Sequence, residues 1–130
     1  MVLDASAAVD YLLGVSAAER IAARIATATE TLHAPHVLDL EVAQALRRLA
    51  RQGVLTTARA EEALGDLAGL RVRRYPHAHL LERIWELRGN LTVFDAAYVA
   101  LAEALDAPLI TADAAIARAP GHGAQVELFQ

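Results

Sequence analysis

The stretch TVFDAAYVALAEALDAPLITAD, residues 92–113, decides how the rest of the chain is interpreted. Its first part is rich in Ala and Leu, which favour helix, so it predicts a helix. The sequence Asp-Ala-Pro at 106–108 ends that helix, and the apolar run at 109–111 predicts a short strand. One acid lies at each end of the stretch, Asp95 in the first helical turn and Asp113 just after the strand. Both are placed to meet acids from earlier in the chain.

The composition excludes several kinds of chemistry. A length of 130 residues predicts a single domain over residues 1–130 with a buried core. The chain has no Cys, so disulfides and thiolate zinc sites are impossible. It has no Lys, which excludes the lysine of a phosphate-binding loop and a Schiff-base lysine. No apolar run reaches the ~18 residues of a membrane span and no signal peptide opens the chain, so we expect a cytoplasmic protein without a membrane partner.

The net charge of −4 argues against a nucleic-acid partner, because phosphates are neutralised by cations. Net charge is an average over the whole surface, however. Four carboxylates clustered around divalent metal would account for the entire deficit. The twelve Arg residues would then still be available for a local basic surface.

Strands are predicted to alternate with helices along the chain. The expected strands lie at 1–3, 31–34, 70–75, 109–111 and 125–129. The expected helices lie at 5–13, 17–29, 37–51, 56–67 and 77–87, then from 92 onward and after 113. Crossovers of this length suit a parallel sheet with helices on its faces.

Four acids are expected at one rim of that sheet. Asp4 and Asp113 each follow a predicted strand, and sites in parallel sheets lie outside the carboxyl ends of the strands. Asp95 and Glu41 lie near helix N-termini, which face the same rim. Four carboxylates at one point repel unless cations are bound, and hard oxygen ligands favour Mg²⁺ or Mn²⁺. Two such ions clamp the attacking and leaving oxygens of a phosphoryl group.

Each acid alone has a simpler explanation. Asp4, Asp95 and Asp113 all lie where a residue caps a helix. Glu41 alone reads as a solvated helix residue, and helical spacing does not separate it from Asp39. The metal-site hypothesis therefore rests on the set and not on any single member.

Five motifs follow one another along nearly the whole chain: VLDAS at 2–6, APH at 34–36, EVAQALRR at 41–48, FDAAYVALA at 94–102 and PLITAD at 108–113. In this order they resemble the PIN-domain ribonucleases and, among them, the VapC toxins of VapBC toxin–antitoxin pairs. The phrase DAAYVALAEAL followed by LITAD is the most specific part. The resemblance also selects Glu41 over Asp39.

The resemblance implies an α/β fold, a PIN-like three-layer α/β/α sandwich with a short central parallel sheet. It implies a metal-dependent endoribonuclease that binds one or two Mg²⁺ or Mn²⁺ ions and orients a water for in-line attack on an RNA phosphodiester bond. The acids that it assigns to this site are Asp4, Glu41, Asp95 and Asp113. Ser6 and Thr111 match positions at which the family carries a hydroxyl beside the acids. A helix cap and a strand-end residue explain these two hydroxyls equally well.

The resemblance further implies an RNA substrate, a small VapB-like antitoxin and a homodimer. The antitoxin would lie across the Ala-rich N-terminal helices and reach into the acidic site with a basic side chain. A PIN nuclease of RNA processing and a non-catalytic PIN-like binding module remain alternatives, and the intact acids count against the second. An aspartyl phosphotransfer domain is disfavoured, because Lys is absent and Ser6 stands two residues after Asp4, where a second acid is common.

Other polar and aromatic residues carry weaker signals. Three basic residues cluster on the predicted helix at 37–51: Arg47, Arg48 and Arg51. Arg88, which precedes the late helix, is the one we single out as an RNA contact. Tyr98 and Trp85 are expected to pack in the core or in an interface. Asp10 is interpreted as a surface residue, with an extension of the acidic rim as the alternative.

Overall fold

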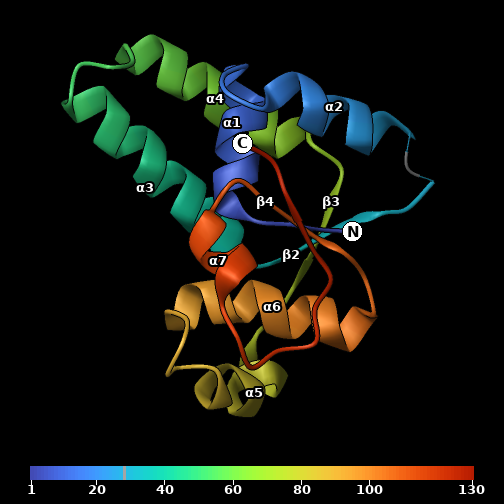
Figure 1. The fold of residues 1–130 in the computed structure, drawn as a ribbon. Coiled ribbons are helices and arrows are strands. Elements are labelled where there is room, and N and C mark those ends of the chain that lie inside the picture. The colour runs from blue at the N-terminus through green and yellow to red at the C-terminus, as the bar shows by residue number, and fades with distance from the viewer. Residues whose placement is uncertain (28) are drawn as a thin grey trace.

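Within residues 1–27 and 29–130, which the computed structural model describes, five short strands form one parallel sheet (Figure 1). They are β1 (Val2–Leu3), β2 (Leu32–Pro35), β3 (Val72–Tyr75), β4 (Leu109–Thr111) and β5 (Val126–Leu128). Their order across the sheet is β3-β2-β1-β4-β5. Since β1 and β4 are neighbours, the residues that follow them lie at one rim of the sheet, as the predicted site requires.

Helices cover both faces of this sheet. They are α1 (Ala5–Leu13), α2 (Ala18–Thr27), α3 (Val37–Arg51), α4 (Thr57–Gly69), the 3₁₀ turn η1 (Ala78–Leu80), α5 (Leu81–Glu86), α6 (Val93–Leu105) and α7 (Ala114–Arg118). Figure 1 shows α1 to α4 on one side of the sheet and α5 and α6 on the other. The predicted three-layer α/β/α sandwich is therefore confirmed.

The boundaries differ from the predictions mainly where a partner strand sets the length. The strand predicted at 70–75 begins only at Val72, because β3 pairs with the four residues of β2 and with nothing before them. The strand predicted at 125–129 is likewise limited to the three residues that pair with β4. The helix predicted at 17–29 is α2, and residue 28 lies outside the described residues. The helix predicted at 77–87 is divided into η1 and α5.

The stretch that opens the sequence analysis forms the centre of the fold. Helix α6 is buried without interruption from Ala96 to Ala102, because it packs between the sheet and α5. The small Ala side chains on it let these layers approach closely. Strand β4 is buried along its whole length. Among the described residues, no helix combines the length and the apolar character that crossing a membrane requires.

Candidate active site

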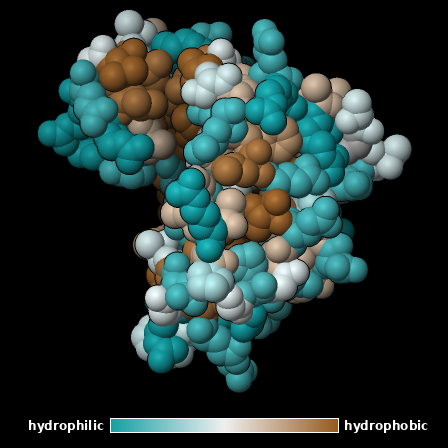
Figure 2. Space-filling view, in the orientation of Figure 1, coloured by the Kyte–Doolittle hydropathy of each residue, from teal (hydrophilic) through white to brown (hydrophobic). Residues whose placement is uncertain are grey.

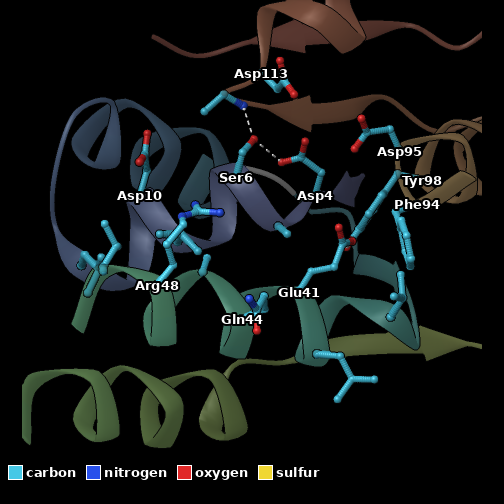
Figure 3. Close-up of a pocket in the computed structure, with 18 of the residues that line it drawn as sticks. Asp4, Ser6, Asp10, Glu41, Gln44, Arg48, Phe94, Asp95, Tyr98 and Asp113 are labelled. Atoms are coloured by element: carbon cyan, nitrogen blue, oxygen red, sulfur yellow. Dashed lines mark hydrogen bonds between the residues drawn. The ribbon is translucent and has the colours of Figure 1, made fainter. Parts of the chain in front are cut away.

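A cleft of about 1060 Å³ opens at the carboxyl edge of the sheet, between α1, α3 and the start of α6. One end of the cleft, the acidic end, is lined by Asp4, Glu41, Asp95 and Asp113. The other, the apolar end, is lined by Val9, Leu13, Val15, Leu49, Val54 and Leu55. Figure 3 shows the four carboxylates around the same space, although they come from four separate segments of the chain. The structure thus brings together all four acids that the sequence selects.

Asp4 is the most constrained of these acids. Its Oδ1 accepts a hydrogen bond from the backbone N–H of Ala7 at 2.9 Å, which makes it the N-cap of α1. The same oxygen accepts the Ser6 hydroxyl at 2.8 Å, and Oδ2 accepts the Thr111 hydroxyl. The predicted cap and the predicted hydroxyl neighbours are therefore both present, and one carboxylate serves all three donors.

The two hydroxyls also connect the ends of β1 and β4. Each has a single hydrogen, which goes to Asp4, so each oxygen is left to accept. Ser6 Oγ accepts the backbone N–H of Ala112 at 2.9 Å, and Thr111 Oγ1 accepts that of Asp113 at 2.9 Å (Figure 3 draws the former). The segments after β1 and β4 are thereby held in fixed register at the rim of the sheet.

Burial dominates the electrostatics of Asp4. The residue is only 2% exposed, and this burial raises its pKa from 3.8 to about 6. Its three hydrogen bonds act against the rise, whereas the neighbouring Asp95 carboxylate adds to it. A buried acid with this pKa is ionised at neutral pH only at a cost, which a bound cation would remove.

Glu41 is held by a residue that the sequence analysis interpreted only as packing. The Tyr98 hydroxyl donates a hydrogen bond to Glu41 Oε1 at 2.7 Å. Tyr98 is 1% exposed, so its expected place in the core is confirmed. Its hydroxyl nevertheless faces the cleft, since Tyr98 lies one helical turn after Asp95 and shares its face of α6. Burial raises the pKa of Glu41, the Tyr98 hydrogen bond opposes this, and the Asp95 charge adds to it.

Asp95 and Asp113 lie at helix starts and are half-buried. Thr92 caps α6 by accepting the backbone N–H of Asp95 at 3.1 Å. Asp113 caps α7 by accepting that of Ala115 at 2.8 Å. Burial raises the pKa of Asp95, and the nearby Asp113 carboxylate contributes in the same direction. Asp113 therefore both caps a helix and lines the cleft, whereas Asp95 lines the cleft and the cap of its helix is Thr92.

The predicted convergence of the four carboxylates on one point is not found. In the part of the chain that the structure describes, no three Asp, Glu or His side chains lie close enough together to hold one metal ion as they stand. The donor set is nevertheless made of carboxylate and hydroxyl oxygens, without Cys or His among the described residues that line the cleft. In its chemistry this set fits a hard cation such as Mg²⁺ or Mn²⁺.

The structure also places two other acids that the sequence analysis considered, Asp39 and Asp10. Asp39 does not line the cleft; its carboxylate forms two hydrogen bonds with the Arg74 guanidinium, at 2.7 and 2.8 Å. The choice of Glu41 over Asp39 is thus supported by the side chains themselves. Asp10 lines the cleft beyond Ser6 and is partly exposed, so its position fits both the surface residue and the extension of the acidic rim that the sequence left open.

The basic residue singled out from the sequence lies elsewhere. The Arg88 guanidinium stacks over the Trp85 ring at 4.5 Å and donates to the Trp85 carbonyl at 2.8 Å, outside the lining of the cleft. Trp85 is 60% exposed and does not belong to the core. The Arg that lines the cleft is Arg48. Its spacing of seven residues from Glu41, two turns along the same helix, is the signal that would have found it.

The comparisons with known proteins identify the family of this chain. Residues 1–122 match the family model described as PIN domain, and the chain belongs to the PIN-domain family. Among its relatives, Ribonuclease VapC9 of Mycobacterium tuberculosis H37Rv is 49% identical over 113 residues, which cover 87% of this chain and 85% of the relative. Ribonuclease VapC1 of the same organism is 44% identical over 130 residues, 99% and 97% of the two chains. The predicted resemblance to VapC ribonucleases is confirmed.

A solved structure supports the fold separately. VapBC2 from Rickettsia felis, bound to a DNA fragment from their promoter, matches with a TM-score of 0.70 and covers 99% of this chain and 98% of that one. The sequence identity is 14%. The sandwich is therefore shared even where few residues are.

Proposed function

We propose that this chain is a Mg²⁺- or Mn²⁺-dependent endoribonuclease and the toxin of a VapBC-type pair, acting in the cytoplasm. The observation that carries the proposal is the acidic end of the cleft, which Asp4, Glu41, Asp95 and Asp113 line from four separate segments of the chain. Relatives named VapC ribonucleases, up to 49% identical, support the choice of RNA as the substrate.

These four acids are the residues that would hold the cation. When bound, the ion supplies a Lewis acid that offsets charge on the phosphoryl oxygens and lowers the pKa of water. Ser6 and Thr111 keep the Asp4 carboxylate in one orientation, so it does not have to reorganise during the reaction. Because the pKa values of Asp4, Glu41 and Asp95 are raised, binding of the cation is coupled to loss of protons from the site.

The proposed protein partners are a VapB-like antitoxin and a second copy of the chain. The name of the VapBC2 structure supports the first of these. The apolar end of the cleft offers the antitoxin a place, with Val54 65% exposed and Val15 46% exposed. Figure 2 shows hydrophobic side chains gathered over α3 and α4, near the loop that joins these two helices. A basic antitoxin side chain at the acidic end would compensate the carboxylates there.

The central experiment compares two Asp→Asn changes on one helix. Asp95→Asn removes a proposed ligand at the start of α6, and Asp106→Asn makes the same change at its C-cap, where Asn tolerates the φ of 49°. With total cellular RNA, wild type and Asp106→Asn are expected to cleave in Mg²⁺ and not in EDTA. Asp95→Asn is expected to lose more than about 100-fold, since metal stabilisation of the reaction amounts to several kcal/mol. Cleavage in EDTA, or by Asp95→Asn at the wild-type rate, would overturn the proposal.

The toxin role is tested in cells. Induced expression of wild type should arrest growth, expression of Asp95→Asn should not, and co-expression of the proposed VapB-like antitoxin should restore growth. Growth arrest that persists with Asp95→Asn would show that the RNA cleavage is not its cause.

A further inference from the structure

We propose that Arg48 binds the RNA phosphate that flanks the one at the acids, and thereby positions a single-stranded segment in the cleft. This inference rests on the proposed ribonuclease function. It adds a substrate contact outside the four acids.

The first observation is the placement of Arg48. Glu41, Gln44, Ala45 and Arg48 line the cleft at successive intervals of three and four residues, which is one face of α3. Arg48 lies seven residues after Glu41, or about 10 Å along the helix axis at 1.5 Å per residue. Long helical side chains lean toward the helix N-terminus, and in Figure 3 the Arg48 guanidinium is directed from α3 toward the acidic end.

The second observation is that this cation is uncommitted. Among the described residues that line the cleft, Arg48 is the one basic side chain. Some of the other guanidiniums have carboxylate partners, among them Arg24 with Glu127, Arg74 with Asp39 and Arg83 with Glu103. Within the described part of the chain, no hydrogen bond or ion pair engages Arg48, and it is exposed. Asp10 shares this part of the cleft without an ion pair to it.

The negative charge of the cleft and of RNA explains why a cationic side chain such as Arg48 is needed. An RNA strand brings one negative charge per nucleotide into a cleft that already carries four proposed ligand carboxylates and Asp10. Divalent cations at the acids offset the charge of the scissile phosphate but not that of its neighbours. A guanidinium binds phosphate through two parallel hydrogen bonds and keeps its charge at any physiological pH. At two helical turns from Glu41, Arg48 meets a neighbouring phosphate.

The opposite side of the acidic end indicates that the bases are unpaired. Phe94, directly before Asp95, lines the cleft and is 54% exposed. An exposed ring beside the site offers a base a stacking surface, and only an unpaired base can reach it. A strand that stacks on Phe94 and binds Arg48 would place the phosphate between them at the acids. A duplex cannot make both contacts.

The test uses two adjacent arginines of α3. Arg48→Ala removes the proposed contact, whereas Arg47→Ala removes a neighbouring exposed Arg that does not line the cleft. Binding is measured in Mg²⁺ in an Asp95→Asn background, with a fluorescein-labelled RNA of twelve uridines as the probe. We expect Arg48→Ala to raise Kd about tenfold and to reduce the slope of log K against log salt by about 0.7, the value for one phosphate contact. Arg47→Ala should change Kd less than twofold, and Arg48→Lys should recover part of the loss.

Cleavage and stability separate this role from a structural one. In the otherwise wild-type protein, Arg48→Ala should raise KM for total RNA about tenfold and leave the thermal unfolding midpoint equal to that of Arg47→Ala. Equal Kd values for Arg48→Ala and Arg47→Ala, with wild type cleaving RNA, would overturn the inference and leave the proposed function intact. Absence of Mg²⁺-dependent cleavage by wild type would overturn both. Binding of a twelve-base-pair RNA duplex as tightly as the single strand would overturn the assignment to single-stranded RNA.

Discussion

Three of the four acids at the acidic end of the cleft belong to two groups, a strand half and a helix half, that differ in burial and in hydrogen bonding. The strand half consists of Asp4, Ser6 and Thr111, at the ends of β1 and β4, and its carboxylate is 2% exposed. Two hydroxyls and a backbone N–H hold that carboxylate in place. The helix half consists of Glu41, Asp95 and Tyr98, on α3 and α6. Its two carboxylates are half-buried, and the Tyr98 hydroxyl holds only one of them.

The difference separates two kinds of contribution to the protein. The hydroxyls of the strand half also accept backbone N–H groups, so this half fixes part of the fold as well as the site. A buried carboxylate without a cationic partner is nevertheless costly, and such groups persist where function requires them. The helix half is less tied to the fold. Changes there are therefore expected to affect chemistry more than stability.

The largest effect that tests this comparison is the dependence of stability on pH. Burial raises the pKa of Asp4 to about 6 in the folded protein, against 3.8 for an ordinary Asp. Between these values the folded state binds more protons than the unfolded state, so the free energy of unfolding falls as pH rises. For Asp4 alone the fall is on the order of 3 kcal/mol. Chemical denaturation in EDTA at several pH values from 4 to 7 measures it.

Asp4→Asn provides the matched control, because Asn keeps an acceptor for the α1 cap and cannot ionise. Most of the fall in the free energy of unfolding between pH 4 and 7 should disappear in this variant. Asp95→Asn should remove a smaller part of that fall. In Mg²⁺ the decline should be offset above pH 6, since the cation binds the ionised acids. An Asp4→Asn protein that loses stability with pH as steeply as wild type would contradict the assignment to the strand half.

The positions of most of the acids in the fold could be predicted from the sequence. Asp4 and Asp113 follow apolar runs, and parallel pairing of β1 with β4 brings the ends of those runs to one edge. The spacing of Thr92 and Asp95 also places Asp95 in the first turn of a helix. These predictions hold because strand ends and helix starts are marked locally by Pro, Thr and Asp. The selection of Glu41 over Asp39 came from the family resemblance, and the structure explains it by the pairing of Asp39 with Arg74.

The contacts made by side chains across the fold were not predictable in the same way. The bond from Tyr98 to Glu41 joins residues 57 positions apart, and only the packing of α6 against the sheet brings them together. The placement of the arginines was misjudged for the same reason. Arg88 is close to Asp95 in sequence but stacks on Trp85, while Arg48 is far from Asp95 in sequence and lines the cleft.

Thr111→Val is the next largest test, and it acts on the strand half. The change keeps the shape of the side chain but leaves Oδ2 of Asp4 without its donor and the Asp113 N–H without an acceptor. Unsatisfied buried groups of this kind cost roughly 2 kcal/mol together. Thr111→Ser keeps the hydroxyl and should lose about 1 kcal/mol through its missing methyl group. Urea denaturation compares the two. A Ser variant less stable than the Val variant would show that packing, and not the hydroxyl, is what this residue contributes.

Tyr98→Phe is the smallest test, and it asks whether the helix half is separable from the fold. Loss of one hydrogen bond to a half-buried carboxylate should cost about 1 kcal/mol of stability. Tyr11→Phe makes the same change at a tyrosine whose hydroxyl has no hydrogen-bond partner among the described residues, and it should be nearly neutral.

The chemistry should respond more than the stability does. The Tyr98 hydrogen bond lowers the pKa of Glu41, so its removal raises that pKa further and shifts the rise of the RNA cleavage rate to higher pH. At neutral pH the rate should fall roughly tenfold, the scale of losing a group that orients a metal ligand. If Tyr98→Phe instead lowers stability as much as Thr111→Val and leaves the pH profile of cleavage unchanged, the helix half is as tied to the fold as the strand half. The distinction between the halves would then lie in burial alone.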